Sequence, residues 1–177
     1  MPPAFTWSHA IAVAEIPPEG REIELVPNER ERAELARHAG VLAVPALVAR
    51  LRVVPDGGGG AVVEGALEAS VRQTCVATLD AFESHLVEPI RVRFAPPSAI
   101  AAGTGEVEIG EAEPPDPLVN GTIDLAALVA EFLALAVDPY PRKPGAVFEP
   151  PEEETREAGD SAFAALAKLK QPQSDKG

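Results

Sequence analysis

Cysteine is nearly absent from this sequence, in which Cys75 is the only thiol among 177 residues. A chain with one cysteine cannot form an intramolecular disulfide, which excludes the disulfide frameworks of small secreted domains. The three histidines lie far apart and show no spacing typical of metal ligands; they are His9, His38 and His85. We therefore expect no metal site and no cofactor.

Long hydrophobic runs are missing as well. No apolar stretch reaches the roughly 18–20 residues that a membrane-spanning helix needs. Residues 1–5 lack the basic and apolar regions of a secretory signal peptide. We therefore expect a cytoplasmic protein without a membrane partner.

Common catalytic motifs are also lacking. The sequence contains no G-x-x-x-x-G-K-[ST], no H-E-x-x-H and no G-x-S-x-G. The glycines at 57–60 follow Asp56 and precede no helix, which disfavours a phosphate cradle. Glutamates are so numerous that no pair of them stands out as an acid and a base. We therefore expect that the protein is not an enzyme.

Basic residues are few relative to acidic ones. The chain has 15 Lys and Arg against 28 Asp and Glu, a formal net charge of −13 at pH 7. Such a charge keeps a protein soluble and repels the phosphate backbone of nucleic acids, whereas it attracts basic proteins. The composition therefore favours a basic protein as the partner.

The clearest pattern that is present lies in residues 47–75. Apolar and polar residues alternate over 47–54 and again over 62–75, and the glycines at 57–60 separate the two runs. Alternation with period two is typical of a strand with one buried face, so the pattern predicts a β-hairpin with one apolar and one charged face. A glycine inside a strand often marks an irregularity, and we expect a bend or bulge at Gly65.

Three other segments show strand patterns. Residues 5–13 alternate and predict a first strand, with residues 21–26 as its short partner. Trp7 falls on the apolar side, which favours a core position over a stacking platform for a nucleic-acid base. Residues 82–94 predict another long strand, irregular at Pro89.

Two segments show helix signals. Asn28 with Glu31 forms a capping-box pattern before a short helix that ends near Gly40. Asp124 is a good N-cap for a longer helix that stops before Pro139. The apolar residues of this second helix recur at helical spacing and predict the face that covers the sheet: Leu125, Leu128, Val129, Phe132, Leu135 and Ala136.

These elements predict an α+β fold. We expect an antiparallel sheet, or a partly open barrel, with one short and one long helix packed on it, within one globular domain at residues 1–145. Residues 98–115 are acidic and rich in Gly and Pro, and predict a solvated loop, with a short edge strand at Val107 and Ile109 as the alternative. Residues 146–177 predict a flexible acidic linker and a short amphipathic tail.

Two segments suggest partner contacts. Tyr140, Arg142 and Lys143 lie in an extended, proline-stiffened stretch, where the alternative is a rigid exit from the helix with Tyr140 packed underneath. The tail carries an apolar stripe, formed by Phe163, Leu166 and Leu169. It could enter a groove on a partner or dock on its own sheet.

Cys75 stands at the end of an alternating strand. No cationic residue is adjacent in the sequence to lower its pKa, which favours a buried structural thiol over a reactive one.

The order of several motifs resembles the YceD family, the large ribosomal RNA subunit accumulation proteins. The motifs are Val63-x-Gly65-x-Leu67-x-Ala69-x-Val71-x-Gln73-x-Cys75, then Ile123-Asp124-Leu125 before a helix that leads to Pro139-Tyr140-Pro141, then the segment Phe163–Lys170. The resemblance implies a cytosolic, non-enzymatic factor that supports the 23S ribosomal RNA and the large ribosomal subunit. Many members carry a C-x-x-C after the strand. Here Thr78 stands three residues after Cys75, so a thiol pair is absent.

The resemblance and the charge together favour action through a basic partner, such as a ribosomal protein or another assembly factor. A direct RNA-binding module is the alternative, because Arg50, Arg52 and Arg72 share the polar face of the predicted hairpin, with Arg91 and Arg93 further along. An enzyme of unrecognised type is the remaining class.

Overall fold

A long antiparallel hairpin forms the middle of the structure, a computed structural model that describes residues 6–102 and 114–147. Strands β3 (Ala43–Pro55) and β4 (Ala61–Thr74) make up this hairpin, as predicted. Asp56 closes the turn, because its Oδ1 accepts hydrogen bonds from the backbone N–H groups of Gly58 and Gly60, both at 2.9 Å. The residue before the glycines therefore organises the turn.

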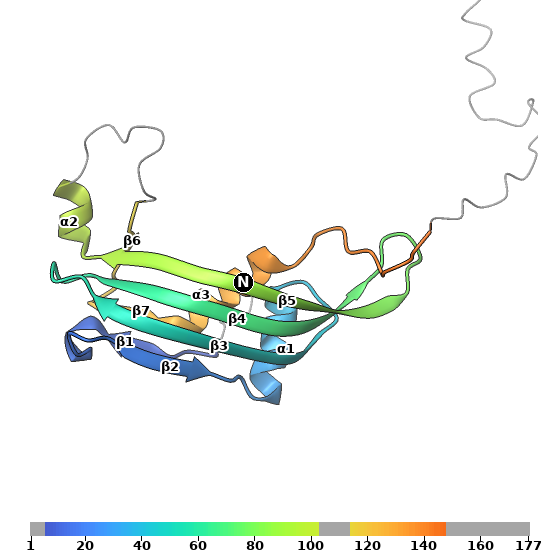
Figure 1. Ribbon diagram of the computed structural model, residues 1–177, viewed down its shortest axis with the longest axis horizontal. Helices are drawn as coiled ribbons and strands as arrows, with labels where there is room; N and C mark the ends of the chain where they lie inside the picture. Colours follow the sequence, from blue (N-terminus) through green and yellow to red (C-terminus); the bar gives the residue numbers. More distant parts are fainter. Residues whose placement is uncertain (1–5, 103–113, 148–177) are drawn as a thin grey trace, which may run out of the picture. The chain divides into compact units, whose positions relative to one another are not determined.

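The hairpin is the centre of an open five-stranded sheet (Figure 1). The strand order is β2 (Arg21–Leu25), β3, β4, β5 (Ala81–Ala95) and β6 (Asp116–Pro117). The first four strands are antiparallel, and β6 adds a two-residue parallel pairing beside the end of β5. The α+β class with a mostly antiparallel sheet is confirmed, and the described strands do not close into a barrel.

The irregularities expected in these strands are not where the sequence placed them. The β3–β4 register runs without a shift past Gly65, and the shift lies between Ala43 and Ala46. Gly65 is special in another way: its φ is 155°, and a Cβ there would collide with the backbone oxygen of Arg50. Glycine is therefore needed for the close approach of two strands and not for a bulge.

Pro89 does not interrupt β5 either, since it pairs with Ala66 in an unbroken register. The backbone oxygen of Ala95 accepts from the N–H of Leu118 at 2.9 Å, on the side of β5 away from β4. Backbone groups alternate in direction along a strand, so every odd-numbered residue of β5 directs its backbone polar groups to that outer edge. Pro89 thus lacks an N–H only where β4 does not need one.

The first strand is shorter than predicted and has another partner. β1 (Ala10–Ala12) pairs antiparallel with β7 (Thr122–Asp124) in a separate two-stranded sheet, and β2 pairs with β3. Asp124 explains this placement, because its carboxylate accepts from Ser8 Oγ at 2.7 Å and from the His9 N–H at 3.0 Å. A 3₁₀ turn, η1 (Val13–Glu15), then ends the strand.

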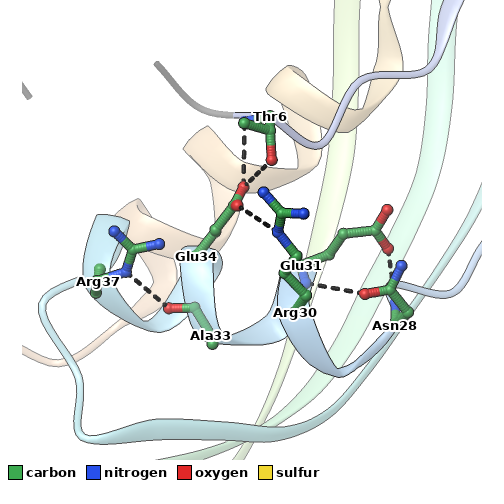
Figure 2. A network of polar contacts seen from close by, with 7 residues as sticks. All are labelled: Thr6, Asn28, Arg30, Glu31, Ala33, Glu34 and Arg37. Atoms are coloured by element: carbon green, nitrogen blue, oxygen red, sulfur yellow. Dashed lines mark hydrogen bonds and ion pairs between the residues drawn. The ribbon is translucent and has the colours of Figure 1, made fainter. Parts of the chain in front are cut away.

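The capping box predicted for α1 (Glu29–His38) is present (Figure 2). The Glu31 N–H donates to Asn28 Oδ1 at 3.1 Å, and the Asn28 N–H donates to Glu31 Oε2 at 2.7 Å. On the same helix, Glu34 accepts from both the Oγ1 (2.5 Å) and the N–H (3.1 Å) of Thr6, and lies 3.6 Å from Arg30 Nε. These contacts tie the N-terminal segment to the helix.

The long helix α3 (Leu125–Ala136) begins at the predicted N-cap, Asp124, which accepts from the N–H groups of Ala126 and Ala127. Its buried face differs from the prediction. Leu133 is fully buried, while the side chain of Leu135 is 74% exposed. The helix contacts α1 and β1 as well as β4 and β5, so its covered face is turned towards those elements.

The core lies between the sheet and the two longer helices. In Figure 1, α1 and α3 lie behind the sheet, on the face that carries the apolar residues of the hairpin. The largest fully buried side chains include Leu35, Leu67, Ile90, Ile123, Leu125 and Leu133. Trp7 is buried, which confirms its core position. The other face of the sheet carries charged side chains and no described helix.

Part of the predicted loop at 98–115 is helical, since α2 (Pro97–Ala102) begins it. Val107 and Ile109 lie outside the described residues. The helices and strands that the structure describes all belong to one compact unit, residues 1–146, whereas residues 148–177 of the proposed tail lie outside the described residues. The flexible acidic tail therefore stays a prediction.

Candidate interaction surfaces

The segment that follows α3, residues 138–143, is bound to the end of the sheet, and we call it the strap. The side chain of Gln73 donates to the backbone oxygen of Asp138 at 3.0 Å. The Val76 N–H donates to the oxygen of Pro141 at 2.9 Å. The strap is thus held at both ends by β4 and the residues that follow it.

These bonds decide how the predicted partner-binding residues of the strap lie. Pro141 is buried, and Tyr140 is 75% exposed. The alternative in which Tyr140 packs underneath the helix exit is therefore wrong. Arg142 and Lys143 are exposed too, and Lys143 Nζ lies 3.6 Å from Asp80 Oδ2. The structure therefore brings all three predicted residues together on the surface.

The sequence did not indicate the apolar residues that lie beside the strap. Leu42 is 58% exposed and Val76 is 45% exposed. Both line a shallow depression of about 290 Å³ together with Pro139 and Pro141. We call this depression and the exposed strap residues the strap surface. Neither Leu42 nor Val76 stands out in the sequence, because each is a single apolar residue next to a strand end.

Cys75 lies under the strap and is fully buried. Its Sγ accepts the backbone N–H of Lys143 at 3.4 Å. Hydrogen bonds from the side chain of Thr78 and the backbone of Lys143 lower the pKa of the thiol to about 7, despite its burial. Burial agrees with the sequence interpretation, but the expectation of an unlowered pKa was wrong, because hydrogen-bond donors replace the missing cations.

The predicted arginine face is the open face of the sheet. Arg50 and Arg52 lie there on β3, and Arg72 is on the same face of β4. Arg72 is six residues along β4 from the partner of Arg50, which corresponds to about 20 Å at the rise of a strand. The structure therefore brings Arg50 and Arg52 together and leaves Arg72 apart.

Glutamates accompany these arginines on the open face. Arg50 Nε lies 2.9 Å from Glu24 Oε2, and its Nη1 lies 3.7 Å from Glu68 Oε1. Glu22 on β2, Arg52 on β3, Glu64 on β4 and Arg91 on β5 are paired side by side across the sheet. The charge in this row therefore alternates between negative and positive. These residues border an open trough of about 790 Å³. The trough therefore carries both signs of charge rather than a basic patch.

The described part of the chain holds no group of three or more His, Cys, Asp or Glu side chains that could bind a metal ion. None of its helices combines the length and the apolar character needed to cross a membrane. Phe163, Leu166 and Leu169 lie outside the described residues, so their role stays a prediction.

Comparison with known protein families gave a match that covers the second half of the described fold. Residues 63–170 match the family described as large ribosomal RNA subunit accumulation protein YceD, which is more than half of the chain. The chain belongs to the YceD family. The comparisons with curated proteins and with solved structures found no match.

The matched region has a clear relation to the candidate surfaces. It begins in β4 and continues through β5 and α3 to the strap and the predicted tail. Tyr140, Arg142 and Lys143 fall inside the YceD match, whereas Arg50 and Arg52 precede it. The part of the chain that resembles other YceD proteins therefore includes the strap and leaves out the centre of the arginine face.

Proposed function

We propose that this protein is a non-catalytic, cytoplasmic factor that supports accumulation of the 23S ribosomal RNA and biogenesis of the large ribosomal subunit. The observation that carries the proposal is the YceD match over residues 63–170, because the family is described by its role in the large ribosomal RNA subunit.

The protein acts through a basic protein, either of the large subunit or another assembly factor. Its net charge of −13 opposes approach to a phosphate backbone, while it speeds the encounter with a positively charged protein. Long-range attraction of this kind raises the association rate more than the final affinity. A second, short-range contact is therefore needed to hold the partner.

The strap surface supplies this contact. Tyr140 offers a large exposed ring with few rotatable bonds, and Leu42 and Val76 offer apolar area beside Pro139 and Pro141, the two neighbours of Tyr140 in the sequence. Aromatic and arginine side chains are enriched among the residues that dominate binding energy, which suits Tyr140 and Arg142. Lys143 adds a cation at the rim. The tail residues Phe163, Leu166 and Leu169 extend the same contact in our proposal.

Direct RNA binding through Arg50, Arg52 and Arg72 is the second candidate. The trough on the open face favours it, because Arg50, Arg52 and Arg91 are among the residues that line it. Against it, Glu24 and Glu68 lie within ion-pair distance of Arg50. A surface with this mixture of signs attracts phosphate weakly.

Affinity purification from cells, with and without nuclease treatment, tests the proposal. We expect a basic large-subunit protein or assembly factor, identified by mass spectrometry, to remain bound after nuclease. Tyr140→Ala combined with Leu42→Ser should release this protein, while the matched control Arg50→Gln with Arg52→Gln should retain it. Loss of the partner after nuclease, or its release by the arginine variant alone, would favour direct RNA binding.

The link to ribosomal RNA needs its own measurement. In cells that lack the protein, the wild-type chain should restore the level of 23S RNA relative to 16S RNA. The Tyr140→Ala, Leu42→Ser variant should restore it less well at equal protein abundance. Unchanged 23S RNA in cells that lack the protein would contradict the proposed function itself.

A further inference from the structure

The outer edge of β5 has a long stretch without a strand partner in the described part of the chain. β5 pairs with β4 along Ala81–Phe94, whereas β6 pairs with it only at Phe94 and Ala95. In Figure 1, β5 runs along the side of the sheet beyond β4, and β6 meets it near one end. Residues 81–93 therefore form an edge of the sheet that no other strand covers in the described part of the chain. We call this stretch the free edge.

This edge can donate and accept backbone hydrogen bonds. The bond from Leu118 N to Ala95 O shows that the odd-numbered residues direct their backbone groups outwards. These residues include Glu83, Val87 and Arg91, and Pro89 contributes an oxygen but no N–H. Unpaired groups in such a row are a template for another strand.

The free edge is symmetric about Val87, which is the middle residue of 81–93. Val87 is 63% exposed although it is a large apolar side chain in the middle of a strand. If a second copy of β5 lies antiparallel with Val87 opposite Val87, the 13 free residues of each copy pair completely, and β6 marks the end of both. No residue of the free edge is then left over.

Charge supports the same register. Within one chain, the row Glu22, Arg52, Glu64, Arg91 alternates in sign, and Glu83 pairs with Arg72 on β4. With Val87 at the two-fold axis, Arg91 stands opposite Glu83 of the second copy. The alternation then continues onto Glu83 and Arg72 of the second copy, and opposite charges on facing strands are favourable. A shift of the centre to residue 88 would instead place Glu88 opposite Glu88, which is unfavourable.

The helix-covered side of the edge offers a second match. A groove of about 570 Å³ beside β5 is lined by Val92, Phe132 and Leu135 among its apolar residues, and by the charged residues Arg91, Arg93, Asp116 and Glu131. Leu135 is 74% exposed. In the register centred on Val87, Phe82 of the second copy lies opposite Val92 on the side of the sheet that faces this groove. The aromatic side chain can fill it and cover Leu135.

We propose that the outer edge of β5 is a homodimer interface, in which two copies pair antiparallel about Val87 to form one continuous sheet. Pro89 withholds one donor in each copy, and Glu83 faces Arg91 of the other copy only when the pairing is centred on Val87, so these residues select the symmetric register over unspecific pairing. This inference is independent of the proposed function.

Disulfide trapping of the purified full-length chain tests the interface. In a Val87→Cys variant, the two new thiols meet at the two-fold axis, at a Cα separation that suits a disulfide. The matched control is Val26→Cys, because Val26 has nearly the same exposure (64% against 63%) and lies away from β5. Cys75 is buried and is present in both variants. We expect covalent dimers from Val87→Cys at least about tenfold faster than from Val26→Cys; equal rates would overturn the proposal.

Sedimentation equilibrium provides the second readout. The wild-type chain should show a concentration-dependent dimer, and Glu83→Arg should shift it to monomer because two arginines then face each other. Adding Arg91→Glu should restore the dimer, with circular dichroism used to check that all variants are folded. A wild-type protein that is monomeric at every concentration would overturn the proposal. So would a dimer that neither Glu83→Arg nor Val87→Lys affects, because such a dimer forms through a surface other than the edge of β5.

Discussion

The backbone N–H of Lys143 donates to the thiol sulfur of Cys75 at 3.4 Å, across 68 residues of sequence. This bond joins the last residue of the strap to the residue that follows β4. The strap is therefore attached to the sheet by the side chain of Gln73, by a backbone hydrogen bond from Val76 and by one buried thiol. Its position depends on β4 as much as on the helix that precedes it.

Replacement of Cys75 should leave function intact. In Cys75→Ser a hydroxyl can still accept from Lys143, and in Cys75→Ala the acceptor is lost, so we expect a modest fall in melting temperature that is larger for alanine. The level of 23S RNA should stay near that of wild type in both. Loss of this RNA at unchanged melting temperature would assign the thiol a chemical role.

Acid should weaken the junction between β1 and α3 through Asp124. Burial raises the pKa of this carboxyl. Hydrogen bonds from His9, Ser8, Ala127 and Ala126 lower the pKa by more than burial raises it, so the pKa lies below its ordinary value. A lowered pKa contributes stability at neutral pH, which is lost as the pH falls through the folded-state value. Below about pH 4, wild type should therefore lose stability more steeply than Asp124→Asn, which keeps an N-cap without the charge. Parallel pH profiles of unfolding free energy for the two proteins would contradict this.

Alanine at Gly65 should be costly. Its Cβ would collide with the Arg50 backbone oxygen, and φ at 155° is unfavourable for any side chain. We expect a loss of at least about 3 kcal/mol in unfolding free energy, measured by urea denaturation. Gly58→Ala is the control, because its Cβ would only touch Asp56 Oδ1 at 3.5 Å. Similar midpoints for the two variants would show that β3 and β4 can separate at this point without penalty.

An aspartate at Leu67 should unfold the domain, since Leu67 is fully buried in β4. An unpaired charge in a core costs several kcal/mol, comparable to a total stability of about 5–15 kcal/mol. Leu135→Asp is the matched control on α3, where the side chain is 74% exposed. Thermal melting followed by circular dichroism should show a cooperative transition near the wild-type temperature for the control only. Cooperative melting of Leu67→Asp near that temperature would place β4 in another register.

Deletion of residues 161–177 should separate stability from function. The buried core of the described residues extends from Trp7 to Leu133, so the melting temperature should hardly change. If Phe163, Leu166 and Leu169 contact the partner, the level of 23S RNA in cells should fall. A deletion that melts the domain would assign the tail to the core, and one that changes neither quantity would place the contact elsewhere.

Local features were predictable because they depend on neighbouring residues. The capping box of Asn28 and Glu31 and the N-cap at Asp124 need only a few consecutive residues, and each was found as predicted. The same is true of the hairpin around residues 57–60, where alternation and a glycine turn define both strands. The candidate residues Tyr140, Arg142 and Lys143 are adjacent in sequence, so their common location was also foreseeable.

What the sequence alone determined was thus the kind of each main element and the periodicity of its faces. The tertiary structure decided the partners: β1 pairs with β7, β2 pairs with β3, and α3 buries Leu133 in place of Leu135. It also decided part of the lowered pKa of Cys75: Thr78, the main donor, is close in sequence, but the second donor, Lys143, is 68 residues away. It placed Leu42 and Val76 beside Pro139 and Pro141. Periodicity indicates which residues of a helix or strand are buried. It does not show which other element covers them, because several distant segments compete for the same apolar faces and backbone groups, and only the tertiary structure shows which of them makes the contact.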